Sequence, residues 1–468
     1  MTSEKEFVVE PEAEEKLDFK RILPIFVIVL IDLLGLTIII PLLPLYAASF
    51  GLTPVMIGVL GAAYPLMQFI GAPTLGRLSD RYGRKPILVI SQIGTLSGFI
   101  LMALATSGLM LFVARIIDGI SGANIATAQA AITDSTSEKT RTQGLGLIGA
   151  AFGLGFIIGP VIAYSALAIS GNDYRAPALA AAFFSLLSIL LTTFWFKETL
   201  PEEKRGQSGD DKPSFSFKSM VTAVTHPTVG LLLVLMFAQQ LAFGGFEQLL
   251  ALFTLSNLGF NASGNAVLFV YIGVIVVAVQ GYFIGKWSRR FGDRRLMFGG
   301  LALLAVGLVL MGLTPRQPMP GYSLAALEAE LSESGNPTVG ETPAAADISI
   351  DLPPDDHNGW LGMVWMMLAM IPVSIGGGIL RPAINSLITK RISAQEAGGM
   401  LGISSSFSSA ANAIAPVIGG IMFQAFGLRS PFLAGGILMA LLLFTAIRVI
   451  MPGREETVEA RFVPSGEH

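Results

Sequence analysis

The sequence predicts an all-α integral membrane protein with twelve transmembrane helices, arranged as two pseudo-symmetric six-helix bundles. Three observations lead to this fold class. Of the 468 residues, 52% are hydrophobic and 13% are charged, whereas soluble proteins carry about 25% charged residues. The chain also contains twelve apolar stretches long enough to cross a bilayer. Finally, a loop motif and a proline recur at matching places in the two halves, as in membrane proteins built from repeats.

The apolar stretches define the predicted spans in chain order. A helix needs about 20 apolar residues to cross the hydrocarbon core. The predicted spans cover residues 22–47, 54–76, 86–106, 109–133, 142–168, 177–197, 226–254, 263–287, 295–314, 359–389, 397–425 and 430–451. The first 20 residues are acidic and polar and show no cleavable signal pattern, so we expect the first span to remain as an anchor.

Positive charge is distributed unevenly between the two sides of this topology. With twelve spans both termini fall on one side, and 25 of the 30 Lys and Arg residues lie in the termini and connections of that side. The opposite connections hold Arg175, Arg316 and Arg429. Because basic residues mark cytoplasmic loops, we expect a multi-pass protein with both termini in the cytoplasm, in a bacterial inner (plasma) membrane.

Polar segments divide the chain into parts. The predicted parts are a cytoplasmic tail at 1–20, a six-helix bundle at 21–197, a cytoplasmic linker at 198–225, a second bundle at 226–452 and a tail at 453–468. Within the second bundle, residues 315–357 form a long outer loop rich in Pro, Gly and acids. This composition predicts disorder or loose order. A tolerated insertion and an accessory binding lid both fit the loop.

The connection between the second and third spans carries an ordered pattern, Gly76-Arg-Leu-Ser-Asp80-Arg-Tyr-Gly83-Arg-Lys85. Its glycines permit a tight turn, and its fixed charges can bind neighbouring helix ends. The pattern resembles the signature loop of the major facilitator superfamily. We expect a conformational latch in which Asp80 lies at the N-terminus of span eleven and Arg84 pairs with an acid at the end of span four. The latch residues are Gly76, Asp80, Arg81, Gly83, Arg84, Lys85 and the alternative acids Asp134 and Glu138.

The second half of the chain repeats parts of the first. Residues 285–294, Gly-Lys-Trp-Ser-Arg-Arg-Phe-Gly-Asp-Arg, occupy the matching loop between spans eight and nine, with Arg289 in place of the acid at Asp80. Pro416 in span eleven likewise matches Pro160 in span five. These repeats favour two related halves over an unrelated twelve-span protein.

Span five is rich in glycine. Gly146, Gly155, Gly159 and Pro160 resemble the antiporter motif of drug/proton exchangers, although Tyr164 stands where the motif continues with a small residue. Small residues four apart allow close helix contact and proline bends the span. A general packing face without bearing on transport direction is the alternative.

Further stretches resemble tetracycline/proton antiporters and related multidrug exporters. They are residues 32–44 in span one, 115–123 in span four and 149–155 in span five. Tetracycline exporters carry an additional acid in span three, where this chain has uncharged residues such as Ser91, Gln92 and Thr95. They carry another in span nine, where residues 301–313 have no charge. The resemblance therefore implies the wider drug/proton family more than tetracycline itself.

Charged residues inside the spans are candidates for proton coupling because a charge at the bilayer centre costs about 2.5–3.5 kcal/mol on insertion scales. Asp32 and Asp118 lie at similar depth, and Arg115 is one turn from Asp118. We expect Arg115 to reach between the two carboxylates. We assign proton carriage to Asp32, on a span bent by Pro41 and Pro44, with Asp118 as the alternative. A static salt bridge between spans one and four would also explain these residues.

Other polar residues fall in the second half or beside these acids. Glu247, on the same face of span seven as Gln240, would gate the outer side, bind a second proton or extend to the interface. Arg381 in span ten would contact an anionic substrate or extend toward the cytoplasm. The candidate substrate cavity consists of Asn124, Gln129, Gln239, Gln240, Arg381 and Asn412, each of which could instead bond between helices.

Several function classes are excluded by missing motifs. The chain has no cysteine, three scattered histidines and no Gly-rich phosphate loop, so we expect no metal, no cofactor, no enzymatic activity and no ATP-driven cycle. The sequence predicts a monomeric secondary transporter that exports small lipophilic or drug-like molecules in exchange for protons by alternating access. Its partners are then the substrate, protons and the lipid bilayer, without nucleic acid. Proton-coupled uptake of a metabolite and a non-transporting sensor remain alternatives.

Overall fold

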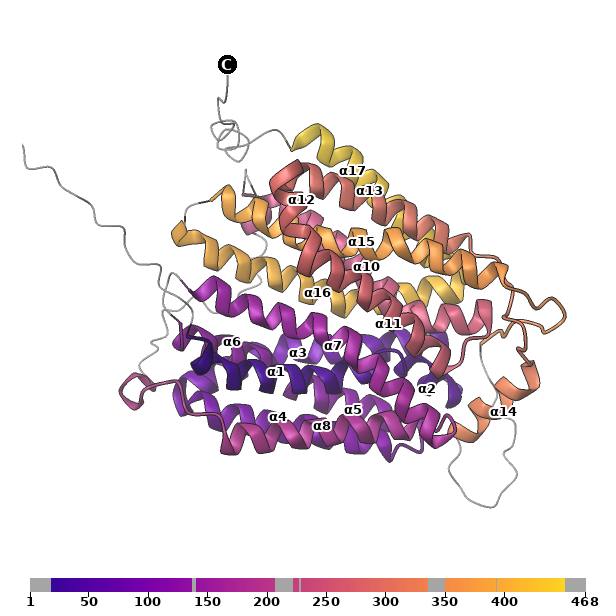
Figure 1. Ribbon diagram of the computed structural model, residues 1–468, viewed down its shortest axis with the longest axis horizontal. Coiled ribbons are helices and arrows are strands. Elements are labelled where there is room, and N and C mark those ends of the chain that lie inside the picture. The colour runs from indigo at the N-terminus through magenta and orange to yellow at the C-terminus, as the bar shows by residue number, and fades with distance from the viewer. Residues whose placement is uncertain are drawn as a thin grey trace, which may run out of the picture.

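The twelve predicted spans are present in the structure, a computed structural model that describes residues 18–136, 140–206, 222–226, 229–335, 350–392 and 394–450. Within these ranges twelve helices are long and apolar enough to cross a membrane. They run along a common direction, the first six forming the lower group in Figure 1 and the last six the upper group. Large apolar side chains such as Ile169, Phe194 and Phe426 are exposed, as expected for helices that face lipid.

The first six spans contain two interruptions. Their helices are α1 (Phe19–Ile39), α2 (Leu43–Ser49), α3 (Pro54–Tyr82), α4 (Arg84–Ala103), α5 (Gly108–Ser121), α6 (Asn124–Asp134), α7 (Arg141–Ser170) and α8 (Arg175–Phe194), followed by the short helix η1 (Glu202–Lys204). Span one was expected over 22–47, bent by Pro41 and Pro44. It ends at Ile39 and resumes in α2, because Pro41 and Pro44 lack the N–H groups that a continuous helix requires.

The last six spans contain one interruption and one additional helix. The helices are α10 (Gly230–Leu258), α11 (Ala262–Ala278), η2 (Val279–Phe283), α12 (Ile284–Phe291), α13 (Asp293–Gly312), α14 (Leu324–Gly335), α15 (Leu361–Lys390), α16 (Ala394–Phe426) and α17 (Ser430–Val449). The segment η2 is a π-helix that joins α11 to α12 within span eight. Single π-helical turns of this kind are frequent at functional sites.

The two halves make close backbone contacts through glycine. We call the end of the bundle where α1 begins the terminal face, and the opposite end the α14 face (Figure 1). Toward the α14 face, a Cβ atom on Gly58 of α3 would lie 2.3 Å from the carbonyl oxygen of Pro416 in α16. One on Gly273 of α11 would lie 2.6 Å from the carbonyl oxygen of Phe156 in α7. Two turns nearer the terminal face, a Cβ atom on Gly149 would meet no atom within 4 Å. Glycine therefore permits the close contact toward the α14 face.

The long loop over 315–357 contains a helix, so the expectation of a disordered or loosely ordered loop was wrong for this part. Helix α14 buries Leu327 and Leu331, which are 5% and 0% exposed. The two residues are four apart and share one face, which packs against α2. Overall composition did not reveal this local spacing. Residues 336–349 of the predicted loop lie outside the described residues.

One carboxylate on α14 joins segments from both halves. Glu330 accepts hydrogen bonds from the Tyr174 hydroxyl (3.2 Å) and the Asn172 amide (3.3 Å), which precede α8, and from the Asn261 amide (3.0 Å), which precedes α11. Ser263 adds a bond of 2.7 Å to the Asn172 side chain. Burial and the adjacent Glu330 carboxylate raise the pKa of Tyr174 well above its usual value, so its hydroxyl remains a donor. Glu330 therefore ties the two halves together at the α14 face.

We predict that Glu330→Ala loosens this connection. The three donors lose a shared charged acceptor, and hydrogen bonds to charged groups contribute about 1.5–3 kcal/mol. Hydrogen exchange followed by mass spectrometry should show faster exchange of the α14 amides than in the unmodified protein. The control is Glu328→Ala, which removes an exposed carboxylate from the same helix. Equal protection of α14 in both variants would show that Glu330 does not hold this helix.

Candidate functional site

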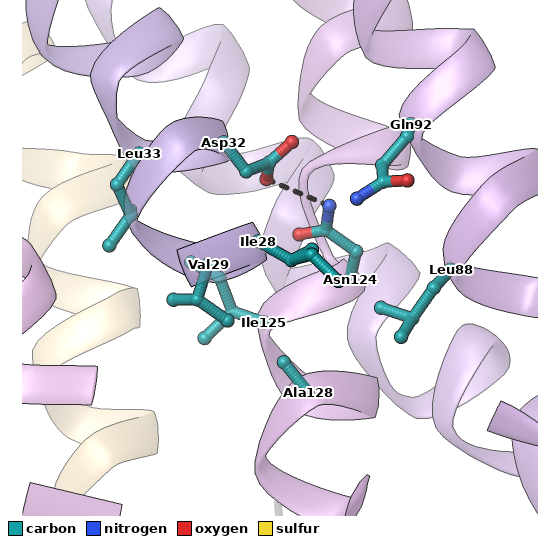
Figure 2. A pocket seen from close by; sticks show the side chains of 9 residues that line it. All are labelled: Ile28, Val29, Asp32, Leu33, Leu88, Gln92, Asn124, Ile125 and Ala128. Atoms are coloured by element: carbon teal, nitrogen blue, oxygen red, sulfur yellow. Dashed lines mark hydrogen bonds between the residues drawn. The ribbon is translucent and has the colours of Figure 1, made fainter. Parts of the chain in front are cut away.

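The carboxylate of Asp32 is held on one side only. Figure 2 shows Asp32 of α1 facing Asn124, whose side-chain amide donates a hydrogen bond of 2.8 Å to Oδ2. The other oxygen, Oδ1, is buried and has no hydrogen-bond partner within the described part of the chain. A buried carboxylate oxygen without a donor is costly as an anion. Asp32 is therefore placed to take up a proton at Oδ1.

Asn124 reaches Asp32 because span four is broken beside it. Helix α5 ends at Ser121 and α6 begins at Asn124, with Gly122 and Ala123 between them. A Cβ atom on Gly122 would lie 2.4 Å from the Tyr64 hydroxyl oxygen, so a larger residue at this position would displace the Tyr64 ring. Tyr64 thus comes close to the break that positions Asn124.

Arg115 forms a buried ion pair with one of the two predicted acids. Its Nη1 atom lies 2.9 Å from Oδ2 of Asp118, and both side chains are 3% exposed. The guanidinium also lies over the Tyr64 ring, 4.5 Å from its centroid, a favourable cation–π geometry. The expectation that Arg115 reaches between both carboxylates was wrong, because Asn124 takes the place beside Asp32. The three-residue spacing fixes the local Asp118 partner instead.

The two carboxylates nevertheless border the same small cavity. Its lining consists of Asp32, Leu33, Leu36, Tyr64, Thr95, Phe99, Asp118, Gly122 and Ile125. Asp32 also borders the neighbouring cavity of Figure 2, together with Gln92 and several aliphatic side chains. Two carboxylates and one arginine leave one negative charge in an apolar setting, which favours a bound proton on one of them.

The glycines of span five bring α7 against the Asp32 region of α1. A Cβ atom on Gly159 would lie 2.2 Å from Thr37 Oγ1, and one on Gly155 would lie 3.4 Å from Thr37 Cγ2. Thr37 donates a hydrogen bond of 2.9 Å to the carbonyl oxygen of Leu33, the residue after Asp32. Pro160 lies inside α7, and the side-chain surroundings of Gly146 lie outside the described residues. The antiporter-like stretch is thus a contact surface for the helix that carries Asp32.

Arg84 is the centre of the signature loop. It contacts the Asp134 carboxylate at 2.8 Å, as expected, and also the Asp80 carboxylate at 2.6 Å. Gly83 has a φ of 105°, a value that favours glycine. Lys85 donates to the carbonyl oxygen of Thr193 at 2.8 Å. The side chains of residues 394–399 at the start of α16, and Glu138, lie outside the described residues, so the placement of Asp80 against span eleven stays a prediction.

Glu198, just after span six, was not among the predicted site residues. Its carboxylate accepts hydrogen bonds from the backbone N–H groups of Arg84 (2.9 Å) and Lys85 (3.1 Å), the first residues of α4. It also accepts one from Leu200. Helix α4 begins after Gly83, which has no side chain to cap it, so a carboxylate from elsewhere satisfies these donors. The missing cap was the signal that could have indicated such a partner.

The matching turn of the second half holds the same kind of pair with reversed charges. Gly292 has a φ of 76°, and Asp293 follows it where Arg84 follows Gly83. Asp293 pairs with Lys390 at 2.8 Å and accepts hydrogen bonds from Ser288 and Ser386. In the first half the turn supplies the cation and the neighbouring span supplies the acid. In the second half the turn supplies the acid and the span supplies the cation.

The predicted polar residues of the second half do not join the Asp32 site through any contact in the described chain. Gln240 donates a hydrogen bond of 2.8 Å to Asn412, linking α10 to α16. Glu247 is half-buried and Arg381 is exposed, and neither forms an ion pair with a described residue. Gln239 is buried with its carbonyl oxygen unpaired within the described residues. In the first half, the candidate cavity residue Gln129 is exposed.

Comparison with known proteins gives consistent matches over nearly the whole chain. The family model described as Major Facilitator Superfamily matches residues 25–359 and 357–466. The chain is 27% identical over 401 residues to the class B tetracycline resistance protein of Escherichia coli, covering 85% of this chain and 87% of that protein. It is 25% identical over 420 residues to multidrug resistance protein 2 of Bacillus subtilis, covering 89% and 92%.

Solved structures share the fold. The crystal structure of the human organic anion transporter MFSD10 (TETRAN) has a TM-score of 0.62 at 21% identity, covering 92% of this chain and all of that one. A POT family transporter in complex with 5-aminolevulinic acid has a TM-score of 0.65 at 14% identity, covering 92% and 97%. At these identities the structural likeness concerns the fold alone.

We predict that Glu198→Ala destabilises the signature loop. The change leaves the first N–H groups of α4 without their acceptor, and the loss of a helix cap costs about 0.5–2 kcal/mol. The apparent Tm of the purified protein in detergent should fall relative to Glu203→Ala, which removes an exposed carboxylate nearby. Equal melting temperatures of the two variants would contradict a capping role for Glu198.

Proposed function

The chain belongs to the major facilitator superfamily, and we propose that it exports small lipophilic or drug-like molecules in exchange for protons. The named relatives are tetracycline resistance and multidrug resistance proteins, which supports efflux as the direction of transport. The protein is a membrane transporter and not an enzyme. We place its terminal face in the cytoplasm of a bacterial cell, in line with the distribution of Lys and Arg.

The observation that carries this proposal is the half-satisfied carboxylate of Asp32. Asn124 binds one oxygen, while the other is buried without a partner among the described residues. Protonation would supply the missing hydrogen and remove the uncompensated charge. Asp118 already has a charged partner in Arg115, whereas Asp32 has none among the described residues. Asp32 is therefore the proposed proton carrier, and Asp118 with Arg115 and Tyr64 is the fixed part of the site.

The proposed cycle alternates access to this site. The close contact of the halves toward the α14 face supports a state in which the site would open toward the terminal face. In that state Asp32 would release its proton to the cytoplasm and cargo would bind. Reorientation to the α14 face would bring Asp32 to a new proton supply, and its protonation would release the cargo. Each turn would thus move protons inward and cargo outward.

The lining of the site supports a lipophilic cargo. Leu33, Leu36, Phe99 and Ile125 contribute apolar surface to the cavity beside the two acids. Thr95, from span three, adds an uncharged polar group to the same lining. Apolar walls with a few placed polar groups are typical of small-molecule sites. The absence of a further acid in span three supports a cargo other than tetracycline.

We predict that Asp32→Asn separates binding from coupling. Asparagine keeps the size and polarity of the side chain but cannot exchange a proton. In proteoliposomes the variant should still bind substrate and permit downhill exchange, but should lose accumulation against a gradient and substrate-induced proton release. Glu203→Gln, a charge removal on an exposed segment, is the control for both assays.

The outcome of this experiment distinguishes the possible roles of Asp32. Uphill transport by Asp32→Asn would show that Asp32 is structural, and the same assays would then be applied to Asp118→Asn and Glu247→Gln. Substrate-induced proton uptake by the unmodified protein would indicate symport. A protein that neither moves substrate nor exchanges protons would fit a sensor and would contradict the proposal.

The signature loop gives a separate prediction for conformational change. We propose that Asp80, held by Arg84 at 2.6 Å, stabilises one of the two states through the N-terminus of α16. Such a dipole contact contributes about 0.3–2 kcal/mol, which corresponds to a change of about 2- to 30-fold in an equilibrium or rate. Asp80→Asn should lower turnover within this range while substrate affinity stays unchanged. Unchanged turnover would exclude the latch, and Asp80→Glu should restore part of any loss.

A further inference from the structure

Arg381 is a charged residue deep in the bundle that the proposed proton pathway does not use. It lies nine residues before Lys390, the last residue of α15 at the terminal face, a depth of about 14 Å at 1.5 Å per residue. Its side chain forms no ion pair or hydrogen bond with the described residues. Placing a charge at such depth costs free energy unless the charge is paired or hydrated. An arginine without a partner in this position is therefore a candidate for a functional role.

The helix face that carries Arg381 points into the protein. Residues three and four apart on a helix are neighbours on one face, so Arg381 shares its face with Gly377, Gly378 and Asn385. A Cβ atom on Gly377 would lie 2.3 Å from the Phe243 ring of α10, and one on Gly378 would lie 3.2 Å from Val279 of η2. These contacts direct this face of α15 toward spans seven and eight.

The residue one turn further along also contacts another helix of the protein. Asn385 accepts a hydrogen bond of 2.9 Å from Ser404 of α16. The exposed apolar residues of α15, Val364, Leu368 and Ile371, form a stripe with spacing of three and four that does not include Arg381. Arg381 is nevertheless exposed. Its exposure is therefore to a space between the helices and not to lipid, which argues against extension of the side chain along the lipid surface.

An irregular stretch of backbone lies beside this space. The π-helical segment η2 packs against α15, and the exposed side chain of Gln280 donates a hydrogen bond of 3.4 Å to the carbonyl oxygen of Gly378, one turn before Arg381. A Cβ atom on Gly281, the next residue of η2, would meet no atom within 4 Å. The segment thus holds the Gln280 amide one turn of α15 from Arg381.

We infer that Arg381 binds an anionic group of the transported molecule, so that the cargo class includes lipophilic organic anions. A guanidinium offers a planar set of donors that matches the two oxygens of a carboxylate. Arg381 and Gln280 form the polar end of this site, and the Phe243 ring lies one helical turn away as an apolar surface. The inference deepens the proposed function and rests on it, because the bound anion is cargo only if the protein transports it. The binding of an anion at Arg381 does not depend on proton coupling.

The test uses three molecules with one aromatic body: 2-naphthoate, its amide 2-naphthamide, and the cation 2-naphthylmethylamine. Affinity is measured with purified protein in a neutral detergent, without a proton gradient. The unmodified protein should bind the carboxylate at least about tenfold more tightly than the amide, as expected when a charged group loses its partner. The cation should bind most weakly.

Two variants and a control locate the preference at Arg381. Arg381→Gln should remove the difference between carboxylate and amide without weakening amide binding. Arg381→Lys keeps the positive charge but lacks the planar pair of guanidinium donors, so it should retain part of the preference. This variant also provides a test if the glutamine variant does not fold. Arg429→Gln, an exposed arginine at the α14 face, should change nothing. An unmodified protein that binds all three molecules equally, or a full preference in Arg381→Gln, would overturn the inference.

A lipid headgroup is the other source of an anion. The measurement is therefore repeated with phosphatidylglycerol added. Full displacement of 2-naphthoate by one equivalent of this lipid would assign the site to lipid and overturn the inference about cargo. Binding that survives added lipid, followed by Arg381-dependent uptake of 2-naphthoate into inverted vesicles, would support it. Anion binding at Arg381 without any proton coupling would refute the proposed export mechanism and leave the anion site standing.

Discussion

The hydrocarbon core of a bilayer provides no hydrogen bonds, and this constraint governs where the chain places its few charged residues. Arg115 and Asp118 neutralise each other, and the Tyr64 ring covers the guanidinium. Asp32 has a single amide donor. The charges of the pair are balanced, whereas one oxygen of Asp32 is buried without a partner among the described residues. The proposed coupling to protons rests on this difference between the ion pair and Asp32.

Helix packing connects this acid to the rest of the protein. Gly155 and Gly159 allow α7 to lie directly on Thr37 of α1. A displacement of α7 would therefore also displace the helix that carries Asp32. The same helix α7 meets α11 of the other half through Phe156 and Gly273. Packed helices move as rigid elements between discrete arrangements. The path from the interface between the halves to Asp32 is therefore short and runs through the contacts of α7 with Gly273 and with Thr37.

The sequence predicted the features that depend on local composition. The twelve spans followed from hydropathy because lipid imposes a minimum apolar length, and the contact of Arg84 with Asp134 followed from an ordered loop motif. Contacts between residues far apart in the sequence were not predicted. Asn124 displaced Arg115 as the neighbour of Asp32 because of a helix break, and Glu198 caps α4 from beyond span six. Helix α14 was not predicted, because its two leucines with helical spacing lie within a segment that is polar on average.

The reversed charges of the two signature turns restrict how the two halves could have diverged. In one half the turn carries Arg84 and the span carries Asp134, while in the other the turn carries Asp293 and the span carries Lys390. If the halves arose by duplication, no single substitution converts one arrangement into the other. Changing one partner alone places two like charges in contact, so the exchange needs a neutral intermediate or two linked changes. A chain in which one turn was exchanged without its neighbouring span would therefore bring two like charges together.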